Sequence, residues 1–501
     1  MKLSPPEVST IASLLTMGGI TLSAQSLTSP PAPAPASPPG TTPPVSQPYP
    51  GLINTWLRQQ APEFEHWDLG VQERFRFESK NYFAANGSGP LAVDFNAATP
   101  VPHNNYTLFR TRVWVGYSPT EWISGYVQAQ SSLQQNWGGD PPPGANGPIG
   151  LYQYWATLGN PKEFPVTLKA GRQELVYGDE RLIGNANWEN VGRVFDAAKL
   201  RYTHGQFWVD AFASSVVLPV NQGTDIVNWD EVFWGLYAQT KGLIPKGTAE
   251  FYFLGDNANT DSQNNVGTVQ RGNSPRDIYT LGTHLKSVPG ALNGWDYDVE
   301  LAGQLGQFQY PRGTPVVVNG KKLDQTSYAM HFEGGYTLTN AWAKPRFGLI
   351  FNQASGDDDP LDEKHETFVN LFPTNHKFYG AMDFFSWQNM REIAATSTWY
   401  PVGKLKATLN FHVFWLQTTE DFSYNATQAA RTTGGYGIRP NNSSGFGQEL
   451  DLILSYPIRK FGAIEGGFGH FFTGDYVDES LANTGGTHDA NWCYVQLNLA
   501  F

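Results

Sequence analysis

The sequence is poor in cysteine and has no long apolar run. Cys493 is the single cysteine among 501 residues, so no disulfide can form within the chain. No window approaches the ~20 continuous apolar residues that a membrane-spanning helix needs, and the mean hydropathy of -0.38 is polar. These two absences exclude an intramolecular disulfide and a helical membrane protein.

Motifs of catalysis are also missing. The sequence contains no G-x-S-x-G, no H-E-x-x-H and no P-loop, and His365-Glu366 is not followed by a second histidine at metal-ligand spacing. The formal net charge of -12 argues against general binding of nucleic acids. We therefore predict a protein that is not an enzyme and that needs no cofactor and no metal ion.

Aromatic residues and glycine, in contrast, are abundant. Phe, Trp and Tyr together make up 14% of the chain, which also holds 52 glycines. Both values are high for a soluble α/β enzyme. They suit a membrane barrel, whose strands carry aromatic girdles and are joined by tight turns.

From about Gly70 onward, apolar and polar residues alternate with the period of two that β-strands impose. In the first such stretch, Phe75 and Phe77 fall on one side, and Arg74 and Arg76 fall on the other. The apolar faces carry Trp, Tyr and Phe with no helices to cover them, and the other faces carry more charge than a packed interior tolerates unpaired. An apolar outside and a charged inside are typical of a membrane barrel with a water-filled lumen. Similar alternation recurs at 107–117, 294–306, 405–415 and 493–501.

This pattern predicts an all-β fold, a single transmembrane antiparallel β-barrel of about 18 strands within residues 61–501. An even number of strands places both ends of the chain on the periplasmic side of a bacterial outer membrane. Barrels of ~16–18 strands leave an aqueous channel. The last strand, which ends at Phe501, would pair with the first, because lipid cannot satisfy an open sheet edge. We expect external loops where Gly, Asp and Asn gather, near 133–148, 257–275, 355–383, 417–444 and 474–490.

The first 60 residues differ in composition from the rest. Residues 1–24 resemble a weak secretory signal peptide, with Lys2 before an apolar stretch and small residues before a cleavage after Ala24. Residues 25–60 are predicted to be a Pro-rich disordered linker, because their Pro, Ala and Ser cannot build a core.

Several stretches resemble the alginate export family of outer-membrane barrels. The best is KAGRQELVYGDERLIGNANWENVGRVFDAAKLRY at 169–202. The others are RFRFES at 74–79, RTRVWVGY at 110–117, ASGDDDP at 354–360, FPTNHKFYGAMD at 372–383, GQELDLILSY at 447–456 and GGFGHFFTGDYV at 466–477. They are spread over residues 70–501, so the resemblance covers the whole predicted barrel.

The resemblance implies an 18-stranded barrel that passes an anionic uronate polysaccharide, alginate in the known case, through an arginine-lined constriction. On that resemblance the first candidates for the constriction are Arg74, either Arg110 or Arg112, Arg172 and Arg193. The alternation of the strands points Arg76 and Arg201 into the lumen and adds them to the candidates, and Arg346 completes the set. Parity continued from Leu168 and Ala170 points Arg172 outward. A bulge near Gly171, or a position beyond the hydrocarbon, would be needed to bring Arg172 inside.

Arginine suits such a lumen because its guanidinium binds a carboxylate in a planar fork and stays charged at every working pH. A ring of weak sites would let a polymer with one carboxylate per sugar enter and also leave. The alternative is that the arginines pair with acids across the lumen, an arrangement found in porins that export no polymer. By parity, the acids on the facing or adjacent wall are Asp296, Asp298, Glu300, Glu333, Glu449 and Asp451.

Two functions therefore stay open, a channel for an anionic polysaccharide and a general or small-solute porin, with a barrel enzyme or adhesin as a third class. A porin predicts an inward-folded loop, whereas an exporter predicts a continuous basic track wide enough for a sugar chain. We expect a monomer in outer-membrane lipid that binds no nucleic acid, with transport driven by the polymer gradient or by periplasmic partners. The acidic run 357–363 could bind Ca²⁺, although its spacing fits a solvated loop better.

Overall fold

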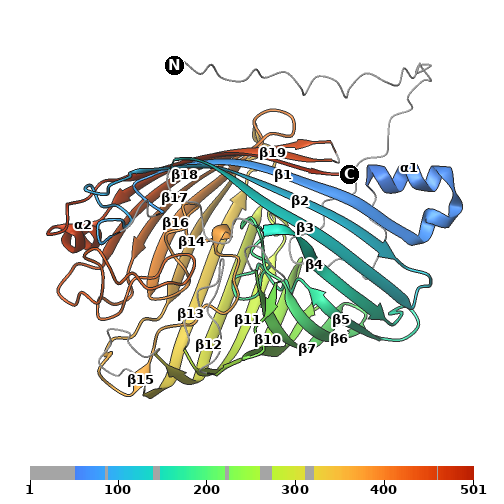
Figure 1. Cartoon of the computed structure of the whole chain (residues 1–501), viewed down its shortest axis with the longest axis horizontal. Helices are drawn as coiled ribbons and strands as arrows, with labels where there is room; N and C mark the ends of the chain where they lie inside the picture. Colours follow the sequence, from blue (N-terminus) through green and yellow to red (C-terminus); the bar gives the residue numbers. More distant parts are fainter. Residues whose placement is uncertain are drawn as a thin grey trace, which may run out of the picture. The chain divides into compact units, whose positions relative to one another are not determined.

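The predicted barrel is present, and its sheet is closed (Figure 1). The computed structural model describes residues 51–84, 89–138, 147–219, 225–259, 274–310, 321–459 and 461–501. Within these ranges the sheet holds 20 strands, of which β8 (Ile226–Val227) and β15 (Lys364–His365) have two residues each and lie outside the wall. The remaining 18 pair antiparallel in chain order, so the expected strand number is confirmed.

The wall strands agree with the alternation in the sequence to within a few residues at each end. The first nine are β1 (Trp67–Asn81), β2 (His103–Tyr117), β3 (Ile123–Gly138), β4 (Gly147–Leu158), β5 (Val166–Gln173), β6 (Phe195–His204), β7 (Phe207–Leu218), β9 (Glu231–Thr240) and β10 (Gly247–Ala258). The other nine are β11 (Arg276–Ser287), β12 (Trp295–Gln309), β13 (Lys322–Thr337), β14 (Arg346–Ala354), β16 (Met390–Trp399), β17 (Lys406–Trp415), β18 (Gly445–Ile458), β19 (Gly462–Thr473) and β20 (Ala490–Ala500).

The closing seam lies between the first and last strands, as predicted. Arg74 of β1 is paired with Asn498 of β20 on one side and with Arg110 of β2 on the other. Because β1 has a partner at both edges, its backbone groups are satisfied within the sheet, which is the condition for a strand to stand in lipid.

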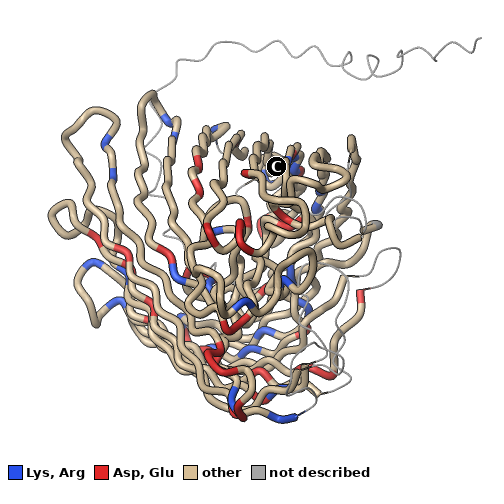
Figure 2. Tube along the Cα trace, turned by 90° about the vertical axis from the view of Figure 1, so that its left-hand side faces the viewer, with Lys and Arg blue, Asp and Glu red and all other residues tan. Residues whose placement is uncertain are grey.

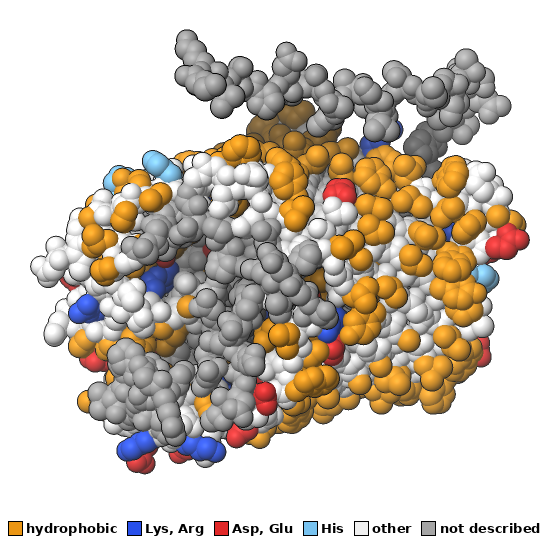
Figure 3. All heavy atoms as spheres, viewed as in Figure 1, with side chains coloured by type: hydrophobic (Ala, Val, Ile, Leu, Met, Phe, Trp, Pro, Cys, Tyr) orange, Lys and Arg blue, Asp and Glu red, His pale blue; other side chains and the backbone are white. Residues whose placement is uncertain are grey.

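Side chains alternate across the wall. In β1, Arg74 and Arg76 are buried inside the barrel, whereas Phe75 between them is 41% exposed on the outside. Cys493 of β20 is exposed on the outer face as well. Figure 3 shows hydrophobic side chains spread over the outside of the wall, the surface that lipid contacts.

Two long segments between strands fold into the barrel. Residues 174–194, here called the crossbar, and residues 355–389, here called the inner loop, contribute Ile183, Phe372 and Trp387 to the main buried apolar cluster. The Phe372 ring lies 4.8 Å from that of Phe233, which points inward from β9. The expectation that 355–383 is an external loop is therefore wrong, because its aromatic side chains pack against the inner face of the wall.

The helices are few and short. Residues 1–50, which include the predicted signal peptide and most of the linker, lie outside the described residues. The last part of the predicted linker is not disordered, because it forms α1 (Leu52–Gln60), and Asn54 donates from Nδ2 to Asp68 Oδ1 at 2.9 Å. The other helical segments are η1 (Pro62–His66), η2 (Asn375–Lys377) and α2 (Asp475–Leu481). No helix among the described residues is long and apolar enough to span a membrane.

Candidate functional site

Four arginines of β1 and β2 share the inner face of the wall, and we call Arg74, Arg76, Arg110 and Arg112 the arginine cluster. The register pairs Arg74 with Arg110, while Arg112 and Arg76 occupy the next inward positions on either side. All four side chains are between 1% and 6% exposed. Strand alternation thus brings together four of the predicted residues.

The arginine cluster holds the backbone of the crossbar. Arg74 donates from Nη1 to the carbonyl oxygen of Asn187 at 2.6 Å and from Nη2 to that of Glu189 at 2.8 Å. Arg76 donates from Nη1 to the carbonyl oxygen of Trp188 at 2.6 Å, and its guanidinium carbon lies 3.7 Å from the centre of the Trp188 ring. The guanidinium groups of Arg74 and Arg76 therefore bind the three successive carbonyl groups of residues 187–189.

Charge within the arginine cluster is only partly compensated. Arg76 Nε lies 2.7 Å from Glu78 Oε1, and Arg112 Nη1 lies 3.7 Å from Glu174 Oε1. No ion pair joins Arg74 or Arg110 to any acid of the described part of the chain, and Arg110 Nε and Nη2 are buried without a hydrogen-bond partner there. Four guanidinium groups thus share two close carboxylates, and positive charge is in excess.

The opposite side of the wall holds the crossbar through ion pairs. Asp179 of the crossbar accepts a hydrogen bond from the ammonium group of Lys286 on β11. Arg181, two residues on, has its Nε 3.5 Å from Glu300 Oε2 of β12 and its Nη2 2.9 Å from His331 Nε2 of β13. The crossbar is thereby tied to the wall at both β1–β2 and β11–β13.

Two further candidate arginines also lie inside the barrel. Arg193 belongs to the crossbar and donates from Nη1 to the carbonyl oxygens of Gly184 (3.0 Å) and Pro373 (2.8 Å), so it links the crossbar to the inner loop. Arg201 of β6 donates from Nε and Nη2 to the two carboxylate oxygens of Asp210, at 2.6 and 2.8 Å. Lys199 Nζ lies 3.6 Å from the same carboxylate, so Asp210 is shared by two cations.

Arg346 and Arg172 stand apart from the rest. Arg346 begins β14 next to a short turn and binds Asp296 and Glu333, the latter at 2.7 Å. Arg172 keeps the outward parity because the β4–β5 register runs without a bulge, and its Nε lies 2.8 Å from the outward carboxylate of Asp196. The inclusion of Arg172 among the lumen-facing candidates is therefore wrong.

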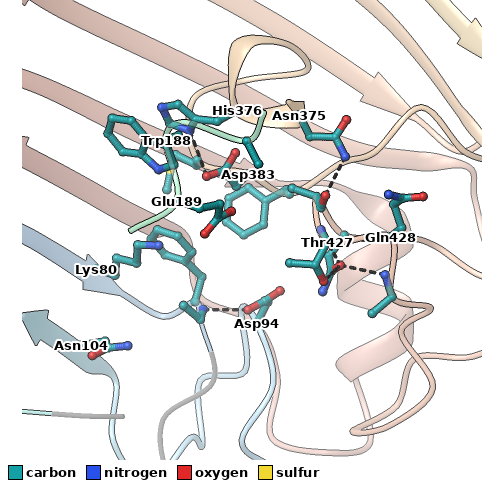
Figure 4. Close-up of a pocket in the computed structure, with 18 of the residues that line it drawn as sticks. Lys80, Asp94, Asn104, Trp188, Glu189, Asn375, His376, Asp383, Thr427 and Gln428 are labelled. Atoms are coloured by element: carbon teal, nitrogen blue, oxygen red, sulfur yellow. Dashed lines mark hydrogen bonds and ion pairs between the residues drawn. The ribbon is translucent and has the colours of Figure 1, made fainter. Parts of the chain in front are cut away.

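A cavity of about 600 Å³ lies beside the arginine cluster (Figure 4). Figure 4 shows Lys80, Glu189 and Asp383 on one side of it, with Thr427 and Gln428 on the other. Burial, together with the neighbouring Asp383 carboxylate, raises the pKa of Glu189. A cavity of this size is within the ~300–1,000 Å³ of small-molecule sites.

The inner wall also carries a belt of polar side chains, one from each of eight neighbouring strands, which we call the polar belt. Its members are Tyr237, Glu250, His284, Asp298, His331, Asn352, Glu392 and His412. Neighbouring members are joined by hydrogen bonds except Asp298 and His331, whose Oδ1 and Nε2 lie 3.7 Å apart. Figure 2 shows acidic and basic positions distributed through the body of the barrel. The alternation in the sequence placed Asp298 and, within 405–415, His412 on the polar face, but it passed over His284 and His331, which the same parity would have found.

Two groups in this region bring three potential metal ligands together. They are Asp179, His284 and Asp298, and Asp298, His331 and Glu333. Lys286 Nζ contacts Asp179 and lies 2.9 Å from Asp298 Oδ2, so an ammonium group already balances these carboxylates. The residues therefore fit an ion-pair network that holds the crossbar.

Solved structures of similar shape are outer-membrane porins of Pseudomonas aeruginosa. OpdQ superposes with a TM-score of 0.52 at 11% identity, covering 87% of this chain and 98% of its own. OpdK, solved with vanillate, gives 0.51 at 10% identity with 87% and 99% coverage. OccK2, solved with glucuronate, gives 0.50 at 10% identity with 87% and 99% coverage. At these identities the likeness establishes the fold.

Sequence comparison is more specific. No curated protein matches the chain, whereas the profile of the family described as Alginate export matches residues 94–490. That range covers most of the barrel, including β2, the crossbar and the inner loop. The closed barrel is a bacterial outer-membrane channel, and the chain belongs to the alginate export family.

Proposed function

We propose that this channel conducts uronate-type anionic saccharides and that the arginine cluster is its selectivity zone. The observation that carries the proposal is the excess of positive charge on adjacent strands, where Arg74 and Arg110 form no ion pair with the acids of the described residues. Arg76, Arg112, Arg201 and Arg346 each lie close to a carboxylate, which reduces their contribution to a net positive field.

A guanidinium group recognises a carboxylate through two parallel hydrogen bonds, and it does so more strongly than it binds a neutral carbonyl group. A saccharide with one carboxylate on each sugar would meet Arg74 and Arg110 on neighbouring strands. Several such sites of moderate strength allow passage, because a solute that binds one site too tightly would not leave.

A second candidate, a channel for small carboxylates, is favoured by the folding of the lumen. The crossbar and the inner loop occupy the barrel interior, and the cavity beside the arginine cluster has the volume of a small-molecule site. Inward-folded segments are the property that distinguishes a small-solute porin from an exporter of long chains. In this conformation short uronates fit better than a polymer.

Planar-bilayer recording tests the proposal and separates the two candidates. We would measure the reversal potential in a salt gradient and the block by uronate oligomers of increasing length, for the wild type and for Arg74→Ala combined with Arg110→Ala. Anion selectivity with oligouronate block, both weakened in the double variant, is the expected result. Block that is limited to monomers and dimers would favour the small-carboxylate channel.

Arg172→Ala is the matched control, because it removes the same charge from the outer face of the wall. Cation selectivity of the wild type, or equal loss of block in the control and the double variant, would overturn the arginine cluster as the selectivity zone.

A further inference from the structure

The cavity beside the arginine cluster lies on the external side of that cluster. Its lining includes Lys80 near the end of β1 and Asn104 near the start of β2, which face each other in the register of the two strands. These strand ends lie opposite to the ends of the chain, which an outer-membrane barrel keeps on the periplasmic side. A solute that crosses the barrel therefore meets the arginine cluster and the cavity in succession.

Three residues of the lining carry polar atoms that have no partner among the described residues. Asn104 is 3% exposed, and its Oδ1 is one of these atoms. Arg431, from the segment after β17, is 8% exposed and contributes its Nε and Nη1. Asp383 of the inner loop accepts from His376 Nδ1 at 2.9 Å through Oδ2, and its Oδ1 is the third case. Because buried polar atoms in native proteins are nearly always paired, the cavity offers both donors and acceptors to a molecule that enters it.

Glu189 of the crossbar adds a further acceptor (Figure 4). Its backbone carbonyl oxygen accepts from Arg74, but within the described part of the chain its carboxyl group forms neither a hydrogen bond nor an ion pair. A carboxylate that is withdrawn from water without receiving donors is costly. This isolation agrees with the raised pKa of Glu189 described above.

Cations also line the cavity, and acids share their charge. Lys80 Nζ lies 3.6 Å from Glu78 Oε2, while Glu78 Oε1 binds Arg76 at 2.7 Å. Arg431 Nη2 lies 3.4 Å from Asp94 Oδ2. The cavity thus presents charges of both signs, in contrast to the arginine cluster, where positive charge is in excess.

The ring of Trp188, although it belongs to the lining, is not open for stacking on a sugar. The His376 ring stacks on it with 3.6 Å between centroids, and the guanidinium carbon of Arg76 lies 3.7 Å from the same ring centre. Two groups this close to one ring centre occupy its opposite faces. Recognition of a solute in this cavity therefore rests on hydrogen bonds and charge rather than on Trp188.

We propose that the cavity binds one uronate unit of the conducted saccharide and recognises it by its hydroxyl groups. The carboxyl groups of Glu189 and Asp383 accept from sugar hydroxyl groups, and the guanidinium group of Arg431 donates to oxygen atoms of the ligand. This assignment rests on the proposed function, which supplies an anionic saccharide. It adds the part of the lumen that distinguishes sugar acids from other carboxylates.

A sugar acid fits this lining better than other small anions do. An inorganic anion or a simple carboxylate supplies acceptors only, so it would leave the oxygens of Asn104 and Asp383 unpaired and would be repelled by Glu189. A hydroxyl group both donates and accepts, and a uronate unit carries several of them beside its carboxylate. A site built for hydroxyl groups rejects an analogue that lacks them, because the polar atoms of the site then stay unpaired.

Isothermal titration calorimetry tests the site in the purified full-length protein, in an amine-oxide detergent that has no sugar headgroup. The probes are glucuronate and cyclohexanecarboxylate, which share a six-membered ring and a carboxylate, although only glucuronate has hydroxyl groups. We expect glucuronate to bind about tenfold more tightly, or better. Equal affinities of the two probes, or no saturable binding of glucuronate, would overturn the proposal.

Glu189→Met is the most direct variant. The carboxyl group that it removes has no hydrogen-bond or ion-pair partner in the described residues, so the fold loses no such contact. Glucuronate binding should weaken about tenfold, since a hydrogen bond to a charged acceptor is lost. Binding of cyclohexanecarboxylate should not weaken, because that probe has no hydroxyl group to donate.

Glu63→Met is the matched control, because Glu63 is an exposed residue of η1 that does not line the cavity. It should bind both probes as the wild type does, and equal losses in the two variants would count against the site.

Failure of this proposal and failure of the proposed function give different results. A cation-selective channel that still prefers glucuronate would refute the arginine cluster as the selectivity zone and support the cavity as a site for sugar acids. An anion-selective channel that binds both probes equally would keep the arginine cluster and refute the cavity.

Discussion

Replacing Arg74 by alanine should release the crossbar from the wall. The side chain donates two hydrogen bonds of 2.6 and 2.8 Å to the Asn187 and Glu189 carbonyl groups. Hydrogen bonds from a charged donor contribute about 1.5–3 kcal/mol each. Their sum is about 3–6 kcal/mol, and water entering from the cavity and relief of repulsion from Arg110 offset part of it.

We therefore take the lower limit, about 3 kcal/mol, as the loss in free energy that holds the crossbar inward. Because 1.4 kcal/mol corresponds to a factor of ten, the displaced state should become about 100-fold more populated. Hydrogen exchange of the amides of 185–193 measures this directly in the detergent-solubilised barrel, where exchange should accelerate by the same factor. Bilayer recordings should show more frequent or larger openings.

Arg172→Ala serves again as the control, since Arg172 binds Asp196 on the outer face and does not touch the crossbar. Exchange at 185–193 within threefold of the wild type in Arg74→Ala would refute the reasoning. It would mean that the remaining contacts, those of Arg76 and Arg110 with residues 187–189 and those at Asp179 and Arg181, hold the crossbar without Arg74.

Three other perturbations have defined outcomes. Asp210→Asn should lower barrel stability to urea by about 1.5–3 kcal/mol, because it removes the buried carboxylate that accepts two charge-assisted hydrogen bonds from the half-buried Arg201; an unchanged midpoint would contradict this. Gly306→Ala should reduce the folded fraction on electrophoresis, because Gly306 has a φ of +139° and a Cβ there would lie 1.9 Å from the Asp277 carbonyl oxygen, whereas Gly303→Ala meets nothing within 4 Å. The protection factors of the amides of 355–367, from which the intrinsic pH dependence of exchange has been divided out, should fall between pH 5 and pH 8 as the buried Asp357 ionises, and Asp357→Asn should remove that fall. The sign follows because the pKa of Asp357, about 7 in the folded protein, exceeds its ordinary ~3.9, so folding stability falls as pH rises through that interval.

The barrel could be predicted from the sequence because lipid imposes a strict rule on every strand. Phe75 must face hydrocarbon and Arg74 must avoid it, so the period of two appears in each of the 18 wall strands. The same rule gave the inward direction of the arginine cluster. It also gave the correct outward direction of Arg172, which the search for a constriction set aside.

The interior could not be predicted in the same way. The crossbar is held largely by its backbone carbonyl groups, for example that of Asn187, and a backbone carbonyl is the same at every position of a sequence. The pairs that join distant segments, such as Arg193 with the Pro373 carbonyl, have no local signature either. In the sequence, the aromatic residues of the inner loop cannot be distinguished from those of a surface loop, because the residues they pack against are distant in the chain.

If the proposed function holds, anion preference and access to the lumen depend on the same side chains. Arg74 and Arg110 both donate to the Asn187 and Glu189 carbonyl groups. A carboxylate is a stronger acceptor than a neutral carbonyl oxygen, so an entering uronate would compete with the crossbar for these guanidinium groups, whereas a neutral sugar would not. We therefore expect uronate oligomers, but not neutral oligomers of equal length, to accelerate hydrogen exchange at 185–193 in the wild type. In Arg74→Ala that difference should shrink, because the competition has lost its main site. If charged and neutral oligomers accelerated exchange at 185–193 equally, uronates would not compete with the crossbar for the guanidinium groups. The arginine cluster would then have a purely structural role.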